Sequence, residues 1–139
     1  MAANQTLTII KPHALRDNNA GAILAVLNKA GFRIAGMKMT RLTRDQTENF
    51  YNEHRGKYFY PPLVDMMSEG PIIVAILEKE NAVTDLRRIV GSTDPAKADP
   101  GTIRRMFGLS MRENAIHASD GDQNALREIG FFFSETERY

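Results

Sequence analysis

His117 stands in the segment NAIHASD, where a short apolar run meets a small, polar, turn-forming tail. An imidazole at such a position can be a buried structural group, a metal ligand, or a nucleophile that attacks phosphorus and then carries the phosphoryl group. The segment predicts a strand end followed by a helix N-terminus, and helix N-termini favour anionic groups. Glu128, near the end of that helix, could reach back to orient the ring. The segment alone leaves all three roles open.

The rest of the chain argues first against a role of His117 as a metal ligand. The three histidines show no H-E-x-x-H or similar pairing. The segment DGDQN, beginning at Asp120, puts acidic and amide side chains at the first three ligand positions of an EF-hand loop. Ala125 then stands where that loop requires Gly, and Phe131 stands where it requires a bidentate Glu. We therefore expect no metal site built from protein side chains.

Phosphate binding would need a site assembled from individual cations. Neither G-x-x-x-x-G-K-[ST] nor G-x-G-x-x-G occurs, so both common backbone cradles for nucleotides are absent. Lys11 ends the first predicted strand, Arg87 lies on a predicted helix, and Arg104 follows DPGTI in a long loop. Guanidinium groups suit bidentate phosphate contacts, but each of these residues could equally be an ordinary surface cation.

The aromatic segment YFYPPL lies beside the start of a predicted helix. Phe59 and Leu63 are four residues apart, so their side chains can share one helix face. Packing in the core is one explanation of this pair, and an apolar clamp on a planar base is the other. The segment by itself does not choose between them.

Composition sets the broad class of the protein. The chain has 139 residues, the length of one domain, and its 42% hydrophobic and 25% charged residues are typical of a soluble globular protein. The net charge of +1 provides no bulk attraction for nucleic acid or an anionic membrane. There is no Cys, which excludes thiolate chemistry, and no signal peptide or membrane span is recognisable. We expect a cytoplasmic protein with one domain over residues 1–139 and with no membrane or specific nucleic acid partner.

Hydrophobic periodicity and turn residues predict the element order β-α-β-α-α-β-α-loop-β-α. The strands are expected at residues 5–11, 32–42, 71–80 and 114–118, and the helices at 18–31, 43–54, 60–67, 81–91 and 119–130. Residues 92–113, with two prolines and two glycines, are expected to form a long, mostly irregular loop. The β-α-β-β-α-β core favours an α+β, ferredoxin-like sandwich, in which helices pack on a four-stranded antiparallel sheet.

Local patterns support several of these elements. Polar Thr alternates with apolar residues in the first strand, and Met37 alternates with polar neighbours in the second. Thr43 and Gln46 have the spacing of a capping box at a helix start, and Asp120 and Gln123 repeat that spacing at the start of the last helix.

The segment NAIHASD also resembles the N-x-x-H-[GA]-S-D active-site signature of nucleoside diphosphate kinases. Four further segments resemble that family in its order and spacing, and together they span most of the chain: TIIKPHAL, FYNEHRGKYFYPPLVDMMSEGPIIVAILEKENAV, GSTDPAKADPGTIR and REIGFFF. The resemblance implies a ferredoxin-like fold. It also implies ping-pong transfer of the γ-phosphoryl group from a nucleoside triphosphate, mainly ATP, to a nucleoside diphosphate, which maintains NTP and dNTP pools.

The resemblance further implies roles for individual residues. His117 would be the nucleophile that becomes phosphohistidine, with Glu128 hydrogen-bonded to its ring and Ser119 beside that contact. The positions at which the family binds phosphates are occupied by Lys11, Tyr51, Arg87, Thr93 and Arg104.

The sugar and the base have implied positions as well. Asn114, together with Lys11, falls where the family contacts the sugar hydroxyls, and Phe59 and Leu63 fall where it holds the base. Mg²⁺ is expected to arrive with the nucleotide phosphates. The long loop would help to close the nucleotide site and to pack subunits together. A homo-oligomer, either a tetramer or a hexamer, is expected.

Two single positions and one short run depart from the family pattern. His13 follows Lys11-Pro12 where the family usually has Asp, which changes the hydrogen bonding expected near Lys11. Ala118 stands where Gly is commoner, and SDGDQNA replaces a run similar to SDSVESA at the start of the last helix. None of the three departures changes a residue to which the resemblance gives chemistry.

The competing hypothesis is a ferredoxin-like regulatory or binding module that holds a nucleotide without turning it over. A pure binder has no need of the pair formed by His117 and Glu128. Their presence together with three candidate phosphate-binding cations favours the enzyme.

Overall fold

Four segments rich in β-branched and apolar residues pair into one antiparallel sheet. The computed structural model describes residues 4–139 and places β1 at Gln5–Ile10, β2 at Arg33–Thr40, β3 at Ile72–Glu78 and β4 at Ile116–Ala118. The strand order is β2-β3-β1-β4, so β1 and β3 are central and β4 is a short edge strand. All four predicted strands are confirmed, although β4 is shorter than expected.

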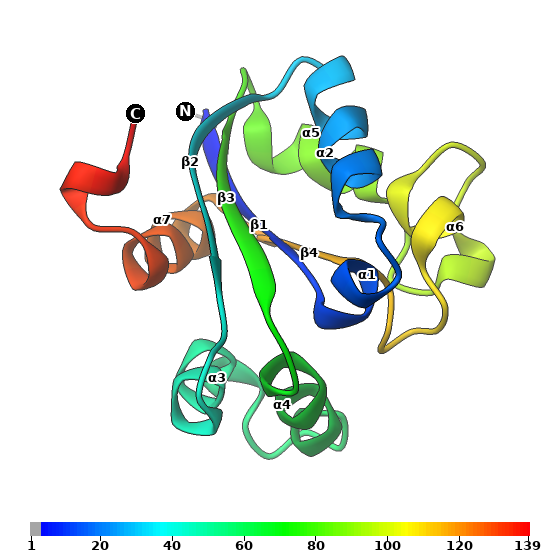
Figure 1. Ribbon diagram of the computed structural model, residues 1–139, viewed down its shortest axis with the longest axis vertical. Helices are drawn as coiled ribbons and strands as arrows, with labels where there is room; N and C mark the ends of the chain where they lie inside the picture. The colour runs from blue at the N-terminus through cyan, green and yellow to red at the C-terminus, as the bar shows by residue number, and fades with distance from the viewer. Residues whose placement is uncertain (1–3) are drawn as a thin grey trace.

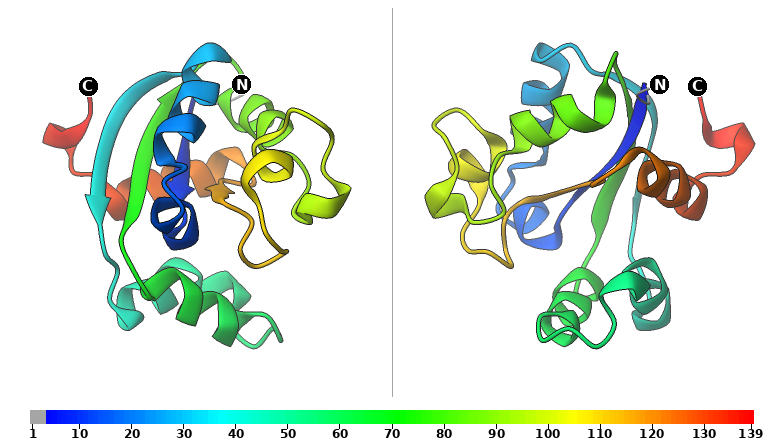
Figure 2. Two further views of the ribbon diagram at one scale, coloured as in Figure 1. Left: turned by 45° about the vertical axis from the view of Figure 1, so that its right-hand side comes forward. Right: turned by 180° about the vertical axis from the view of Figure 1, so that it is seen from behind.

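Helices cover both faces of this sheet. In chain order they are α1 Pro12–Arg16, α2 Ala20–Lys29, α3 Arg44–Phe50, α4 Tyr60–Ser68, α5 Ala82–Val90, α6 Ile103–Phe107 and α7 Asp122–Phe132, with 3₁₀ turns at Asn52–His54, Pro95–Lys97 and Glu135–Glu137. Helices α2 and α5 lie on one face and α7 lies on the other, while α3 and α4 sit at the end of the sheet where β2 ends and β3 begins (Figures 1 and 2). The predicted ferredoxin-like α+β sandwich is confirmed.

The two faces of β1 supply two separate halves of the core. Leu7 and Ile9 pack with side chains of α3, α4 and α7, among them Phe50. Ile10 packs on the other face with side chains of α2 and α5, among them Leu86. All five are at most 1% exposed, and burial of each such side chain contributes roughly 1.5–3 kcal/mol to folding. The strand that carries Lys11 at its end is therefore fixed from both sides.

The polar face of β1 is not solvent-facing, contrary to what its alternating pattern suggests. Thr6 and Thr8 are fully buried because helices cover both sides of the central strands. The hydroxyl of Thr8 donates to the backbone carbonyl of His117 at 2.8 Å. This hydrogen bond joins the strand that carries His117 to the central strand β1.

Strand β2 is confirmed, but its methionines lie on the surface. Met37 and Met39 are 50% and 64% exposed. The pairing with β3 shifts register between Ile34 and Gly36, as in a β-bulge. The extra residue reverses the alternation of side chains beyond it. Met37 then pairs with Ala75, whose side chain packs with α2 and α5, but Met37 itself stays exposed on the edge strand.

The two predicted capping boxes had different outcomes. At α3, the hydroxyl of Thr43 accepts the N–H of Gln46, and the Gln46 side chain accepts the N–H of Thr43, so this box is confirmed. At α7 the prediction was wrong. The helix begins at Asp122, and its N-cap is Gly121, which has no side chain with which to cap it. Asp120 lies one residue too early, and its carboxylate accepts from Asn124 instead.

Two short helices were absent from the sequence-based prediction. Helix α1 follows β1 directly, with Pro12 in its first turn, where a missing N–H costs nothing. Helix α6 interrupts the long loop, and the hydroxyl of Thr102 caps it. Arg104 therefore projects from a helix and not from irregular loop. No helix within residues 4–139 has both the length and the apolar character to cross a membrane.

Candidate active site

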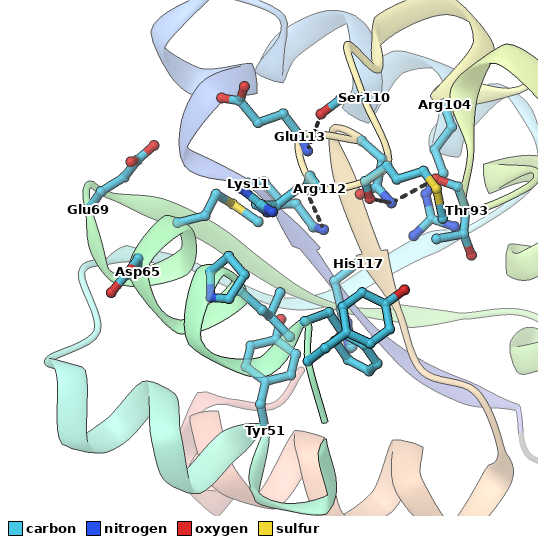
Figure 3. Close-up of a pocket in the computed structure, with 17 residues that line it drawn as sticks. Lys11, Tyr51, Asp65, Glu69, Thr93, Arg104, Ser110, Arg112, Glu113 and His117 are labelled. Carbon is cyan, nitrogen blue, oxygen red and sulfur yellow. Dashed lines mark hydrogen bonds between the residues drawn. The ribbon is translucent and has the colours of Figure 1, made fainter. Parts of the chain in front are cut away.

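One cavity of about 980 Å³ collects the candidate residues from distant parts of the chain (Figure 3). It lies among the end of β1, the start of α4, the segment before β4 and β4 itself. Eight of the residues proposed from the sequence line it: Lys11, Tyr51, Phe59, Leu63, Thr93, Arg104, Asn114 and His117.

His117 is held from behind by a buried carboxylate. It is the central residue of β4 and pairs with Ile9 of β1. Its Nε2 lies 2.7 Å from Oε1 of Glu128, which α7 places beneath the strand with a side chain only 3% exposed. Because the carboxylate accepts a hydrogen bond, Nε2 carries the proton and Nδ1 keeps its lone pair. Nδ1 is thus the nitrogen of this imidazole that could act as a nucleophile.

The orienting carboxylate is itself fixed. The hydroxyl of Ser119, which is fully buried, donates to the same Oε1 of Glu128 at 2.7 Å. Burial raises the pKa of Glu128, but the hydrogen bonds from His117 and Ser119 outweigh it and the net pKa is lowered. Glu128 is therefore ionised at neutral pH, as a group that stabilises positive charge on an imidazole must be.

Two buried cations face the same cavity. Lys11 is 6% exposed and Arg104 is 8% exposed. Burial and the neighbouring Arg104 lower the pKa of Lys11 to about 7, and burial and the nearby Arg87 lower the pKa of Arg104 to about 10. Arg104 donates to the carbonyls of Gly91 and Ile116 at 3.2 and 2.8 Å, so its position is fixed. Two like charges held together away from water favour a polyanionic ligand.

Several polar atoms around the cavity are buried without a hydrogen-bond partner among residues 4–139. They are the hydroxyl of Tyr51, Nε of Arg104 and Oδ1 of Asn114. Burial raises the pKa of Tyr51 strongly, so its hydroxyl stays protonated and can donate. The amide nitrogen of Asn114 donates to the carbonyls of Thr93 and Met111 at 3.1 and 3.0 Å, which fixes the side chain. Unpaired groups in a cavity wall indicate a ligand that supplies partners.

The opposite wall of the cavity is apolar and aromatic. Phe59 and Leu63 are half-buried at the start of α4, and Leu63 also packs against the core. Arg87 does not line the cavity. It is exposed on α5 and donates to the carbonyl of Ala118 at 3.5 Å, beside the histidine. The cavity therefore has cationic side chains near His117 and an aromatic and apolar patch at the start of α4.

The chain matches the family model described as nucleoside diphosphate kinase over residues 4–138. The chain belongs to the nucleoside diphosphate kinase family. It is 50% identical over 137 residues to the nucleoside diphosphate kinase of Sorangium cellulosum, covering 99% of this chain and 95% of that one. It is 46% identical to the nucleoside diphosphate kinase of Flavobacterium psychrophilum over the full length of both.

Solved nucleoside diphosphate kinases share the fold closely. The Aquifex aeolicus nucleoside diphosphate kinase superposes with a TM-score of 0.96 at 41% identity, covering 98% of this chain and 99% of that one. A Halobacterium salinarum nucleoside diphosphate kinase, solved in complex with CDP, has a TM-score of 0.93 at 31% identity, covering 97% and 90% of the two chains. The protein is thus an enzyme of this family, a phosphotransferase acting between nucleotides.

Sequence reasoning missed part of the wall of this kinase's cavity. The remaining lining residues are Tyr58, Pro62, Asp65, Met66, Glu69, Ser110, Met111, Arg112 and Glu113. Those on α4 follow Phe59 at helical spacing, so the periodicity that groups Phe59 with Leu63 also contained Met66. Those before β4 had no such signal, because their segment is irregular. There the carbonyl of Arg112 accepts from Nζ of Lys11 at 3.4 Å.

Proposed function

We propose that this nucleoside diphosphate kinase works by a ping-pong reaction through a phosphohistidine at Nδ1 of His117. The proposal is supported chiefly by two hydrogen bonds to Glu128, one from the hydroxyl of Ser119 and one from Nε2 of His117. His117 lines a cavity that Lys11 and Arg104 also line. This arrangement supplies a fixed nucleophile, a carboxylate for the charge on its ring, and cations for the phosphates.

In each half-reaction, one bond to the transferred phosphorus atom forms while another bond to it breaks. The lone pair of Nδ1 forms a bond to the γ-phosphorus of a nucleoside triphosphate, mainly ATP, while the bond to the β,γ-bridging oxygen breaks and the diphosphate leaves with that electron pair. A second nucleoside diphosphate then attacks the phosphohistidine with a terminal β-phosphate oxygen, and Nδ1 leaves. Nearly equal bond energies on the two sides make positioning and charge stabilisation the main tasks of the protein.

The lining residues, together with Arg87 beside the histidine, divide into three proposed subsites. Lys11, Tyr51, Arg87, Thr93 and Arg104 would contact the phosphates, and Asn114, with Lys11, the sugar hydroxyls. Phe59 and Leu63 would hold the base by apolar contact, which accommodates every base. The CDP bound to the Halobacterium salinarum relative supports a nucleoside diphosphate as ligand.

Magnesium is proposed as part of the substrate. Mg²⁺ keeps several waters and is commonly held by phosphates together with one or two carboxylates. Asp65, Glu69 and Glu113 are the carboxylates that line the cavity, so a single contact from the rim to a phosphate-bound ion fits the residues present.

We further propose that the chain acts as one catalytic domain, in a cytoplasmic homo-oligomer, tetramer or hexamer.

The deciding experiment is incubation of the enzyme with γ-labelled ATP. An acid-labile, base-stable phosphoprotein is expected, and addition of unlabelled nucleoside diphosphate should discharge the label into a new triphosphate. Formation of labelled triphosphate without any labelled protein would contradict the ping-pong reaction and indicate direct transfer.

Lys11 gives nucleotide binding a specific pH dependence. Its pKa of about 7 in the free enzyme leaves it mostly neutral at pH 8, whereas bound phosphates favour the charged form. Binding at pH 8 should therefore take up close to one proton, and affinity should weaken by about tenfold per pH unit above 7. Calorimetry in buffers of different ionisation enthalpy measures the uptake. The Lys11→Gln variant should show weak binding with little uptake; unchanged uptake would rule Lys11 out as its source.

Phe59→Ala should weaken nucleotide binding by roughly 1–3 kcal/mol, as for base stacking on other proteins. The loss should be similar for adenine, guanine and cytosine nucleotides, because stacking requires only a π-face. Phe59→Tyr serves as the matched control and should retain most of the affinity. Equal affinities of Phe59→Ala and the unmodified enzyme would assign the ring to packing instead.

A further inference from the structure

Asn114 and His117 are separated by a backbone turn that few residues adopt. Ala115 has a φ of +76°, and the N–H of Ile116 donates to the carbonyl of Asn114 at 3.0 Å, two residues back. These features define a γ-turn of the positive-φ form, which is rare and strained. Ala115 is not glycine and is fully buried. Contacts from outside the turn must therefore hold it in place.

Those contacts come from the segment that begins α1. The carbonyl of Ala115 accepts the N–H of Lys11 at 2.9 Å, and the N–H of Ala115 donates to Nε2 of His13 at 2.8 Å. His13 is fully buried. We call these two hydrogen bonds the Ala115 clamp. The clamp joins the segment that carries Lys11 to the turn between Asn114 and His117.

We propose that His13 is a positioning residue of this kinase, whose neutral imidazole holds the Ala115 turn and thereby aligns Asn114 and His117 with the nucleotide. The inference rests on the proposed roles of Asn114 and His117. It concerns a departure from the motif of the family, which usually has Asp where His13 stands. A carboxylate accepts a hydrogen bond at all but strongly acidic pH, whereas an imidazole accepts one only while it is neutral.

Protonation of His13 would break the clamp. Nε2 would then carry a proton that points at the N–H of Ala115, and donor would face donor. Charged groups around the ring are Lys11, Arg16 and Asp17 from its own segment and Glu113 from the segment before β4. Burial is the main influence and lowers the pKa of His13 from 6.5, with Glu113 and Asp17 opposing and the two cations reinforcing it. The clamp is thus intact at neutral pH and opens in acid.

The sign of the stability change follows from this lowered pKa. Below pH 6.5 the unfolded chain binds a proton at His13 more readily than the folded chain does, so the free energy of unfolding decreases as the pH falls. The matched variant is His13→Gln, since the Gln amide oxygen reaches about as far from the backbone as Nε2 and accepts a hydrogen bond without titrating. His13→Asp restores the family residue and provides a second acceptor.

The first measurement follows the clamp directly and does not depend on catalysis. In the unmodified enzyme, the amide resonance of Ala115 should titrate with the same midpoint as the ring of His13, and that midpoint should lie below 6.5. That titration should vanish in His13→Gln and persist in His54→Gln, a matched loss of another histidine. The proposal would be overturned if the amide resonance of Ala115 did not change as His13 ionises, or if it still titrated in His13→Gln.

The second measurement follows phosphoenzyme formation from γ-labelled ATP in single turnovers over the pH range of that titration. Relative to His13→Gln, the unmodified enzyme should lose about tenfold in rate for each pH unit below the pKa of His13, because one more proton inactivates it. Parallel pH profiles of the two proteins would overturn the positioning role. Absence of phosphoenzyme in both proteins at every pH would overturn the proposed function, while the Ala115 titration would still decide the clamp.

Discussion

His117→Ala will bind nucleotides but will form no phosphoenzyme, and its phosphoryl exchange will fall by about 10⁴-fold or more. The expectation follows from the geometry around Nδ1. It is the nitrogen left with a lone pair once Nε2 engages Glu128, and the residue lines the cavity that contains Lys11 and Arg104. Removal of the ring takes away the only proposed carrier of the phosphoryl group, so the remaining groups can bind substrate without transferring it.

The measurement is labelling with γ-labelled ATP, combined with calorimetric binding of a nucleoside diphosphate. Binding should change little, because the contacts proposed between the phosphates and Lys11 and Arg104 remain. His54→Ala is a matched loss of imidazole outside the Glu128 contact and should still acquire label. Label in His117→Ala at a rate similar to that of the unmodified enzyme would assign the nucleophile elsewhere in the chain.

The elements with strong periodicity could be predicted because their local pattern and their tertiary environment agree. Strand β3 is a continuous apolar run and is central. The capping box at Thr43 forms as its spacing suggests. The Phe59–Leu63 pair also has both features: helical spacing predicts a shared face, and the cavity lies on it.

Other features depend on contacts between distant segments, which a local pattern does not contain. Burial of Thr8 in the sheet depends on helices that cover both of its faces. The face of the sheet on which Met37 lies depends on the bulge in β2, which reverses the alternation. The γ-turn at Ala115 depends on His13, about a hundred residues earlier, and Ala carries no turn signal of its own.

For the candidate site too, part could be predicted from local sequence and part depends on contacts between distant segments. His117, Lys11 and Arg104 could be selected as chemically able residues, but residue types alone left surface and structural roles open for each. The motif resemblance made the selection, and the geometry adds what neither gives: burial of both cations and the Nε2 contact to Glu128. The segment before β4, which contributes Arg112 and Glu113 to the wall, had neither periodicity nor a motif.

Glu128→Gln should lower the rate of phosphoenzyme formation by about 10²–10⁴-fold while leaving nucleotide affinity nearly unchanged. As Nδ1 attacks phosphorus, positive charge develops on the imidazole, and the ionised carboxylate 2.7 Å from Nε2 stabilises it. An amide has similar size but no charge. Its NH₂ group can also face the ring as a donor, which would favour the tautomer with its proton on Nδ1 and remove the lone pair that attacks.

Two further variants separate charge from position. Ser119→Ala keeps the carboxylate but removes the hydroxyl that fixes its Oε1, so a smaller loss, about 10–100-fold, is expected. Glu135→Gln, an exposed carboxylate on the 3₁₀ turn at Glu135–Glu137, is the control for loss of one negative charge and should not change the rate. A Glu128→Gln enzyme that forms phosphohistidine at the rate of the unmodified enzyme would mean that the backbone of β4, fixed by the hydroxyl of Thr8, orients His117 without help from the carboxylate. The burial of Glu128 and its hydrogen bond from Ser119 argue for the opposite result, because a carboxylate held this firmly behind the ring is positioned to respond to charge on it.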